Sequence, residues 1–350
     1  MDKKYIEDRT IFSTIVGSNA YGTNTPESDI DIRGVAIMDN LKYYFGYLDR
    51  FEQFEDKVND FVIYDIRKAF RLISGANPNM LDLLFVDEKF HQFVHPLWER
   101  VLDNRDEFLS KRVRFSYIGY AVAQLKGIKT ARGWLLNPPQ KKPERSDFGL
   151  PEKKVLLKSD IGAFQWIMSH LLQNTIEYLN LSDATKEELK EANWIGLVQR
   201  KGVPDYCWDE TQNITGASDK WMDAMKREQG YINAKRHFDS YMQWKHGRNK
   251  KRADLEAKFG YDTKHASHLV RLMRMGKEIL SEGKVLVFRP DAEELKEIRN
   301  GSWSYDKIEE YAHTMEQEII ALMDTSPLPK EPNRKFLNQL CVDIIKEYLN

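Results

Sequence analysis

The stretch GSNAYGTNTPESDIDIRG, from Gly17 to Gly34, decides the fold of this chain. A short run rich in β-branched residues, 11–16, precedes it and predicts a buried strand that ends at Gly17-Ser18. A helix-compatible segment and a polar turn follow, and residues 30–38 then read as a second strand. Each feature alone is common, but their succession within one block is specific.

Two aspartates stand on the second predicted strand. Asp29 and Asp31 are two residues apart, so on a strand both carboxylates point to one face. Ile30 and Ile32 are then expected to enter the core. Clustered carboxylates suit Mg²⁺ or Mn²⁺, which prefer oxygen ligands and can align a nucleoside triphosphate for in-line transfer. We therefore predict that Asp29 and Asp31 are metal ligands and catalytic residues.

Gly17 and Ser18 directly follow the first predicted strand. A glycine at such a position lets the backbone approach a phosphate closely. The N–H groups of the next residues and the Ser18 hydroxyl can hold phosphate oxygens. Gly17 and Ser18 are therefore predicted to bind the nucleotide.

The pattern GS-x-A-x-G-x-x-x-P-x-S-D-x-D-x-R-G resembles the signature of the DNA polymerase β nucleotidyltransferase superfamily. More narrowly, it resembles the RNA-ligase-associated predicted nucleotidyltransferases of bacteria and phages. The stretch Asp60 to Phe85 is similar to that family's second block, and Gly260 to Gly301 to its C-terminal block. The resemblance thus covers about residues 10–325 and is weak around 140–240.

The resemblance implies a third carboxylate on a later strand, and two residues could supply it. Asp60 stands at the mouth of the predicted strand 61–64, and Asp65 falls in the first turn of the helix that follows. Asp65 there could simply favour the helix dipole. We prefer Asp60 as the third metal ligand and catalytic residue, where it could also help to deprotonate the acceptor hydroxyl.

Three basic residues in the C-terminal block share one helical face. Lys264, His268 and Arg271 are spaced by four and by three. Such a face could bind triphosphate or a polynucleotide backbone, although a solvated face has the same spacing. With the resemblance, these three residues are predicted to bind nucleotide and to face the carboxylates. Arg33, just past the carboxylates, could pair with them or with phosphate, and Lys68 and Asn77 match the second block without an assigned role.

A basic run, Lys245 to Arg252, follows Tyr241 and Trp244. Basic side chains beside aromatic rings are typical of single-stranded nucleic-acid binding. An exposed helix boundary has the same composition, so both interpretations stay open.

The hydrophobic periodicity predicts mixed strands and helices first and mostly helices afterwards, which is an α+β fold in three parts. The resemblance implies that residues 1–110 are a nucleotidyltransferase domain of the polymerase β type with a small mixed sheet. Residues 111–325 form a larger α-helical domain with a variable insert around 140–240, and 326–350 form a C-terminal helical tail. Asn79 and Asp82 resemble a capping box for a helix over 80–85. Longer helices are expected at about 98–109, 112–131, 160–182, 184–199, 217–242, 252–282, 291–300, 304–324 and 333–349.

Composition narrows the class of protein. The 350 residues carry a formal net charge of −1, which gives no general argument for nucleic acid. Cysteine occurs only at Cys207 and Cys341, which offers no disulfide framework. The charged beginning MDKKYIEDRT does not resemble a targeting segment, and no run is apolar enough for a membrane. We expect a cytoplasmic protein.

The expected activity is transfer of a nucleoside monophosphate from a triphosphate, such as ATP, to an acceptor. The resemblance implies an RNA end as acceptor, in RNA repair, with an RNA ligase as partner. The near-neutral charge leaves open a small molecule or a protein hydroxyl as acceptor. A non-catalytic nucleotide-binding module is a third alternative, against which the intact Gly17-Ser18 and Asp29-x-Asp31 argue. The preferred nucleotide and the oligomeric state stay open.

Overall fold

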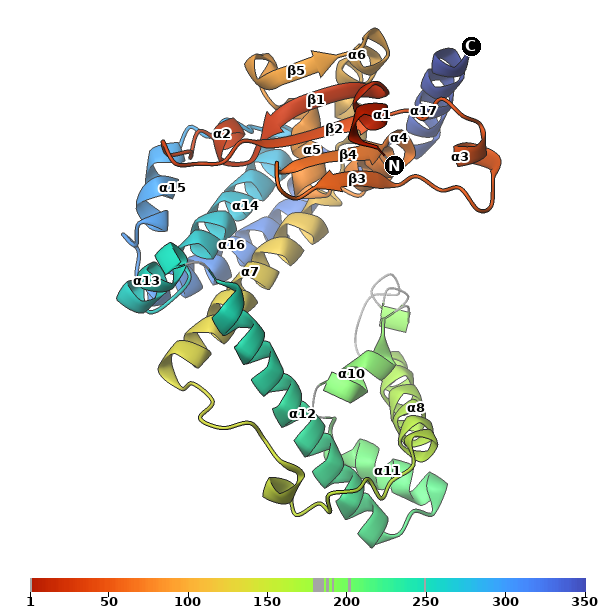
Figure 1. Cartoon of the computed structure of the whole chain (residues 1–350), viewed down its shortest axis with the longest axis vertical. Helices are drawn as coiled ribbons and strands as arrows, with labels where there is room; N and C mark the ends of the chain where they lie inside the picture. Colours follow the sequence, from red (N-terminus) through yellow and green to blue (C-terminus); the bar gives the residue numbers. More distant parts are fainter. Residues whose placement is uncertain (1, 179–185, 187–188, 191, 201–202, 249) are drawn as a thin grey trace. The chain divides into compact units, whose positions relative to one another are not determined.

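The computed structural model describes every residue except 1, 179–185, 187–188, 191, 201–202 and 249. It divides into two compact units. The sheet unit comprises residues 1–136 and 249–350, and the helical unit comprises residues 137–248. A mixed sheet followed by a larger helical region confirms the predicted α+β class (Figure 1).

The sheet unit is built on five strands in the order β3-β4-β2-β1-β5. β2 and β4 are parallel, and the other neighbouring strands are antiparallel. The sequence did not predict β3 and β5, because each has only four residues and neither is fully buried. The strands are β1 (Thr10–Val16), β2 (Asp31–Ala36), β3 (Gln53–Asp56), β4 (Phe61–Asp65) and β5 (His91–Val94).

Helices surround this sheet in the same unit. They are α1 (Lys3–Glu7), α2 (Gly17–Tyr21), α3 (Lys42–Phe45), α4 (Ile66–Ser74), α5 (Pro78–Phe85), α6 (Pro96–Asp103), α7 (Val113–Leu136), α13 (Lys250–Phe259), α14 (Thr263–Glu282), α15 (Ala292–Arg299), α16 (Tyr305–Thr325) and α17 (Arg334–Leu349). Short 3₁₀ turns lie at Glu88–Phe90 and Arg105–Phe108.

One hydrophobic core joins the sheet to helices that are distant in sequence. Phe12 of β1, Tyr117 of α7 and Leu269 of α14 are fully buried in it. α7, α14 and α16 pack against one another (Figure 1). The compact units therefore differ from the sequence-based boundaries at 110 and 325, because these helices bury their apolar faces in the same core as the sheet.

The predicted helix over 252–282 is two helices. The chain turns at Gly260, whose φ of 76° lies in the left-handed region. Asp262 then caps α14, where its carboxylate accepts a hydrogen bond from the backbone N–H of His265 at 3.0 Å. The helical pattern of the sequence continues across residues 252–282, so it did not indicate this break.

The helical unit has a small core of its own. Phe164, Met168, Met222 and Met225 pack with buried Cys207. Its helices are α8 (Lys158–Thr175), α10 (Trp194–Arg200), α11 (Asp205–Thr215) and α12 (Asp219–Gly247), with 3₁₀ turns at Arg145–Phe148 and Ile176–Tyr178. The predicted helix over 184–199 lies partly outside the described residues. Throughout the described chain, every helix is too short or too polar to cross a membrane.

Candidate active site

The ends of three strands meet where β1 leaves the sheet. Val16, the last residue of β1, pairs with Asp31, the first residue of β2. β4 runs parallel to β2 with Phe61 beside Ile32, so Asp60 comes level with Asp31. The backbone N–H of Ile32 donates to the carbonyl oxygen of Asp60 at 2.9 Å. Gly17 and the carboxylate cluster (Asp29, Asp31 and Asp60) therefore gather at one end of the sheet.

The strand that carries the carboxylates starts later than predicted. β2 begins at Asp31, so Asp29 lies before the strand rather than on it. Ile30 is 58% exposed, which makes the prediction that it enters the core wrong. The side-chain amide of Asn19 donates to the carbonyl oxygen of Asp29 at 3.0 Å. Asp29 is thus positioned by α2, not by the alternation of a strand.

The negative charges of the other two aspartates affect the ionisation of Asp31. Its pKa is raised, first by burial and then by Asp60, with a smaller contribution from Asp29. Arg33 and Lys264 partly oppose this rise. The three carboxylates repel one another, and two cations lie nearby. Binding of a further cation would reduce this repulsion.

Gly17 is required for its contact with Asp31. Its φ is 68°, and a Cβ built there would lie 2.4 Å from the Oδ2 atom of Asp31. No residue with a side chain fits without displacing that carboxylate. Ser18 and Asn19 follow as the next residues of α2.

The structure separates the two candidates for the third carboxylate. Asp60 is exposed beside Asp31 and has a φ of 45°, a strained backbone for a residue with a Cβ. Asp65 lies at the opposite end of β4, 2% exposed, where it caps α4 and bonds the backbone N–H of Arg67 at 2.9 Å. Only Asp60 joins Asp29 and Asp31.

The donor set fits a hard divalent cation. Among the described residues, no three Asp, Glu, His or Cys side chains already enclose a metal position. Mg²⁺ does not need such a cage, since it usually keeps several waters and takes one or two carboxylates. The mutual repulsion around Asp31 is consistent with that kind of binding.

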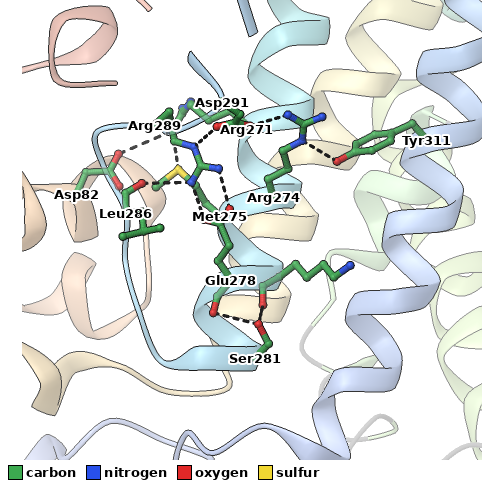
Figure 2. Close-up of polar contacts among 11 residues, drawn as sticks. Asp82, Arg271, Arg274, Met275, Glu278, Ser281, Leu286, Arg289, Asp291 and Tyr311 are labelled. Carbon is green, nitrogen blue, oxygen red and sulfur yellow. Dashed lines mark hydrogen bonds and ion pairs between the residues drawn. The ribbon is translucent and has the colours of Figure 1, made fainter. Parts of the chain in front are cut away.

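The predicted basic stripe on α14 is not one exposed face. Lys264 is exposed, His268 is partly buried and Arg271 is only 6% exposed. The stripe therefore runs from the solvent near Asp31 into the core beneath α2. Arg271 lies over the Tyr21 ring, 3.7 Å from its centre. Its Nη1 atom is 4.0 Å from an oxygen of Asp82 (Figure 2).

His268 is uncharged at neutral pH. Burial, reinforced by Arg271 and Lys264, lowers its pKa to about 3. The unfolded chain takes up this proton near pH 6.5, so the unfolding free energy should fall as the pH drops from about 6.5 to about 3. His268→Gln should reduce that slope by up to about 1.4 kcal/mol per pH unit in urea denaturation at several pH values. An unchanged slope would mean that the imidazole is solvated.

Other candidates lie away from the carboxylate cluster. The Lys68 ammonium donates to Gln53 at 2.9 Å, and the Asn77 side chain donates to the Tyr120 hydroxyl at 2.9 Å. Both contacts are structural. Arg33 stays at the site and reaches the carbonyl oxygen of Asn79 at 3.5 Å.

The aromatic and basic residues near the end of α12 belong to the helical unit. The Tyr241 and Trp244 rings lie 5.9 Å apart, and the Arg248 guanidinium covers the Trp244 ring at 4.0 Å. Asn249 lies outside the described residues, as do the side chains of the two basic residues 251 and 252. In the described part, these contacts pack the helix end.

Sequence reasoning missed Tyr21 and Asp82. The predicted capping box is wrong, because Asn77 precedes α5 and Asp82 is buried inside it. The Asp82 carboxylate instead accepts a hydrogen bond from the Tyr21 hydroxyl at 2.5 Å. The available signal was the segment PNMLDLLF, in which one acid stands among apolar residues.

Comparison with known proteins confirms the resemblance over the N-terminal part. Residues 3–134 match the model of a family described as the RNA repair pathway DNA polymerase beta family. The chain is also 27% identical over 137 residues to an uncharacterized 38.9 kDa protein in the nrdC-mobD intergenic region of Enterobacteria phage T4. That match covers 35% of this chain and 40% of the phage protein. No solved structure matches the chain. The family match ends before Gly260 to Gly301, so it does not test the similarity expected there.

Proposed function

We propose, from the family match of residues 3–134, that this chain is a metal-dependent nucleotidyltransferase that acts in RNA repair. One observation carries the proposal. The Gly17-Ser18 turn and the carboxylates of Asp29, Asp31 and Asp60 lie at the same end of the sheet, although they come from three separate strand ends. A triphosphate on the turn would place its phosphates beside the carboxylates.

The chain's own groups would divide the work. Asp29, Asp31 and Asp60 would hold Mg²⁺ or Mn²⁺, which would neutralise the triphosphate charge and align the reacting phosphate. The Ser18 hydroxyl and nearby backbone N–H groups would orient the phosphate oxygens. Asp60, which is exposed beside Asp31, would accept the proton of the attacking hydroxyl as the new P–O bond forms and pyrophosphate leaves.

Two cations would complete the nucleotide site. Arg33 and Lys264 both act on Asp31 electrostatically, so both would also attract a phosphate bound there. His268 is neutral and would serve as a hydrogen-bonding group rather than a charge. Arg271, the third member of the stripe, is buried below α2 and would act on the nucleotide indirectly.

We take an RNA end as the acceptor because the family description refers to RNA repair. A protein or small-molecule hydroxyl remains the second candidate, which the formal net charge of −1 favours. Incubation with labelled nucleoside triphosphates and a cell extract separates the two. Label lost on nuclease digestion supports RNA, and label lost on protease digestion supports a protein acceptor.

Removal of divalent metal should abolish the activity. We expect no transfer in excess chelator, because Arg33 and Lys264 are too few to neutralise a triphosphate beside three carboxylates. Addition of Mg²⁺ or Mn²⁺ should restore turnover. Full turnover in chelator would contradict the metal mechanism, and thermal denaturation with and without chelator checks that the chain stays folded.

A further inference from the structure

A cluster of three buried polar residues, the polar cluster, connects α2 to α5 and α14. It consists of Tyr21, Asp82 and Arg271, none more than 9% exposed. The Tyr21 hydroxyl donates to Asp82 at 2.5 Å, and the Arg271 guanidinium stacks on the Tyr21 ring at 3.7 Å. A small cavity beside Tyr21 and Asp82 is also lined by Gly17 and Arg33. The polar cluster is therefore adjacent to the candidate active site.

Stability alone does not account for the polar cluster. In the described structure the Oδ1 atom of Asp82 and the Nε atom of Arg271 have no hydrogen-bond partner. The Nη1 atom of Arg271 reaches only the sulfur of Met275, at 3.2 Å, and a carboxylate oxygen of Asp82, at 4.0 Å (Figure 2). Buried charges with incomplete partners lower stability compared with apolar side chains of similar size.

α2 depends on its surroundings for its position. It has five residues, too few to form a stable helix alone, and the Val16 side chain offers no cap. Its last carbonyl oxygen, that of Tyr21, accepts the backbone N–H of Arg289 at 3.1 Å. Arg289 is in turn fixed to Glu278 of α14 by bonds of 2.5 and 2.8 Å (Figure 2).

We propose that Tyr21 and Asp82 are positioning residues. Together with Arg271, they hold the Gly17-Ser18 turn at a fixed position relative to α14. The inference rests on the proposed function. α14 brings Lys264 close enough to Asp31 to act on its charge, and Gly17 lies directly against the Asp31 side chain. The polar cluster ties these two parts of the nucleotide site together without touching the nucleotide.

Tyr21→Phe is the direct test. It keeps the ring beneath Arg271 and removes only the hydroxyl that bonds Asp82. We expect the Kd for the Mg²⁺–nucleotide complex to rise about five- to tenfold, the effect of losing one ordinary hydrogen bond. kcat at saturating nucleotide should change less than about twofold, because the variant leaves the metal-binding carboxylates and the Gly17 contact with Asp31 unchanged and weakens mainly ground-state binding.

Tyr44→Phe is the matched control. The Tyr44 ring packs against the same core, and its hydroxyl accepts a hydrogen bond from the backbone N–H of Met38 at 3.0 Å. Tyr44 lies near Asp65, at the end of β4 opposite to Asp60, so removal of its hydroxyl should lower Tm but leave nucleotide affinity unchanged. Asp82→Asn is the second variant, and combined with Tyr21→Phe it should weaken binding less than the product of the two single effects.

Three outcomes would overturn the inference. Wild-type affinity in both Tyr21→Phe and Asp82→Asn would show that the cluster does not position the turn. Equal losses in Tyr21→Phe and Tyr44→Phe, in proportion to their Tm values, would indicate a purely structural role. A wild-type chain that binds no Mg²⁺–nucleotide complex and transfers nothing would instead refute the proposed function, and the inference with it.

Discussion

Asp31→Asn is expected to lower nucleotidyl transfer by at least about 100-fold, because loss of one ligand misplaces the reacting phosphate. The same substitution should not destabilise the metal-free chain. The pKa of Asp31 is raised by burial and by Asp60, so the charged form is disfavoured where it stands. In the same preparation of this variant, turnover should therefore fall while the Tm measured without metal does not. Asp29→Asn and Asp60→Asn should also lose transfer.

Asp65→Asn provides the matched control at the other end of β4. Asp65 caps α4 and pairs with Arg67 at 2.9 Å. Asparagine caps helices about as well as aspartate, so the substitution should mainly weaken the pair with Arg67 and leave transfer intact where the chain is folded. Wild-type transfer by Asp31→Asn, or lost transfer in folded Asp65→Asn, would contradict the assignment of the carboxylates.

Gly17→Ala is expected to have the second large effect. The new Cβ would lie 2.4 Å from the Oδ2 atom and 3.3 Å from the Cγ atom of Asp31. Either the Asp31 carboxylate or the Gly17-Ser18 turn must shift, so transfer should fall by about 100-fold or more. A φ of 68° adds strain of about 1 kcal/mol for alanine.

Gly216→Ala separates the strain from the clash. Gly216 has nearly the same φ, 65°, at the end of α11, and a Cβ there would meet nothing within 4 Å. It should lose about 1 kcal/mol of stability and keep full transfer. Equal transfer rates in Gly17→Ala and Gly216→Ala would show that the Gly17 contact with Asp31 is not part of the site.

The local pattern was sufficient for the centre of the site. The β-branched run before Gly17 and the Asp-x-Asp segment predict two strands around a turn, and β1 and β2 pair there. Periodicity alone did not choose between Asp60 and Asp65, since each stands at one end of the same short strand. That choice needed the parallel pairing of β2 with β4, a contact between segments distant in sequence.

The burial of Arg271 and Asp82 could not be predicted from spacing. Helical periodicity places Lys264, His268 and Arg271 on one face, but α2 covers only the Arg271 end of that face. Asp82 has the local pattern of a capping residue, and its bond to Tyr21 depends on tertiary packing across 61 positions. Arg271→Ala should therefore destabilise the fold, because removing a buried cation beside Asp82 leaves that carboxylate without its nearest charge.

The most direct measurement follows the two ends of the nucleotide. The full chain, Mg²⁺ and an RNA with free ends are incubated with triphosphate labelled at the α-phosphate or, in parallel, at the γ-phosphate. Nucleotidyl transfer predicts α-label on the RNA and γ-label released as pyrophosphate, with both signals absent in Asp31→Asn. Transfer of the γ-label would identify a kinase and contradict the account, and so would a lack of α-label on any acceptor from the cell extract.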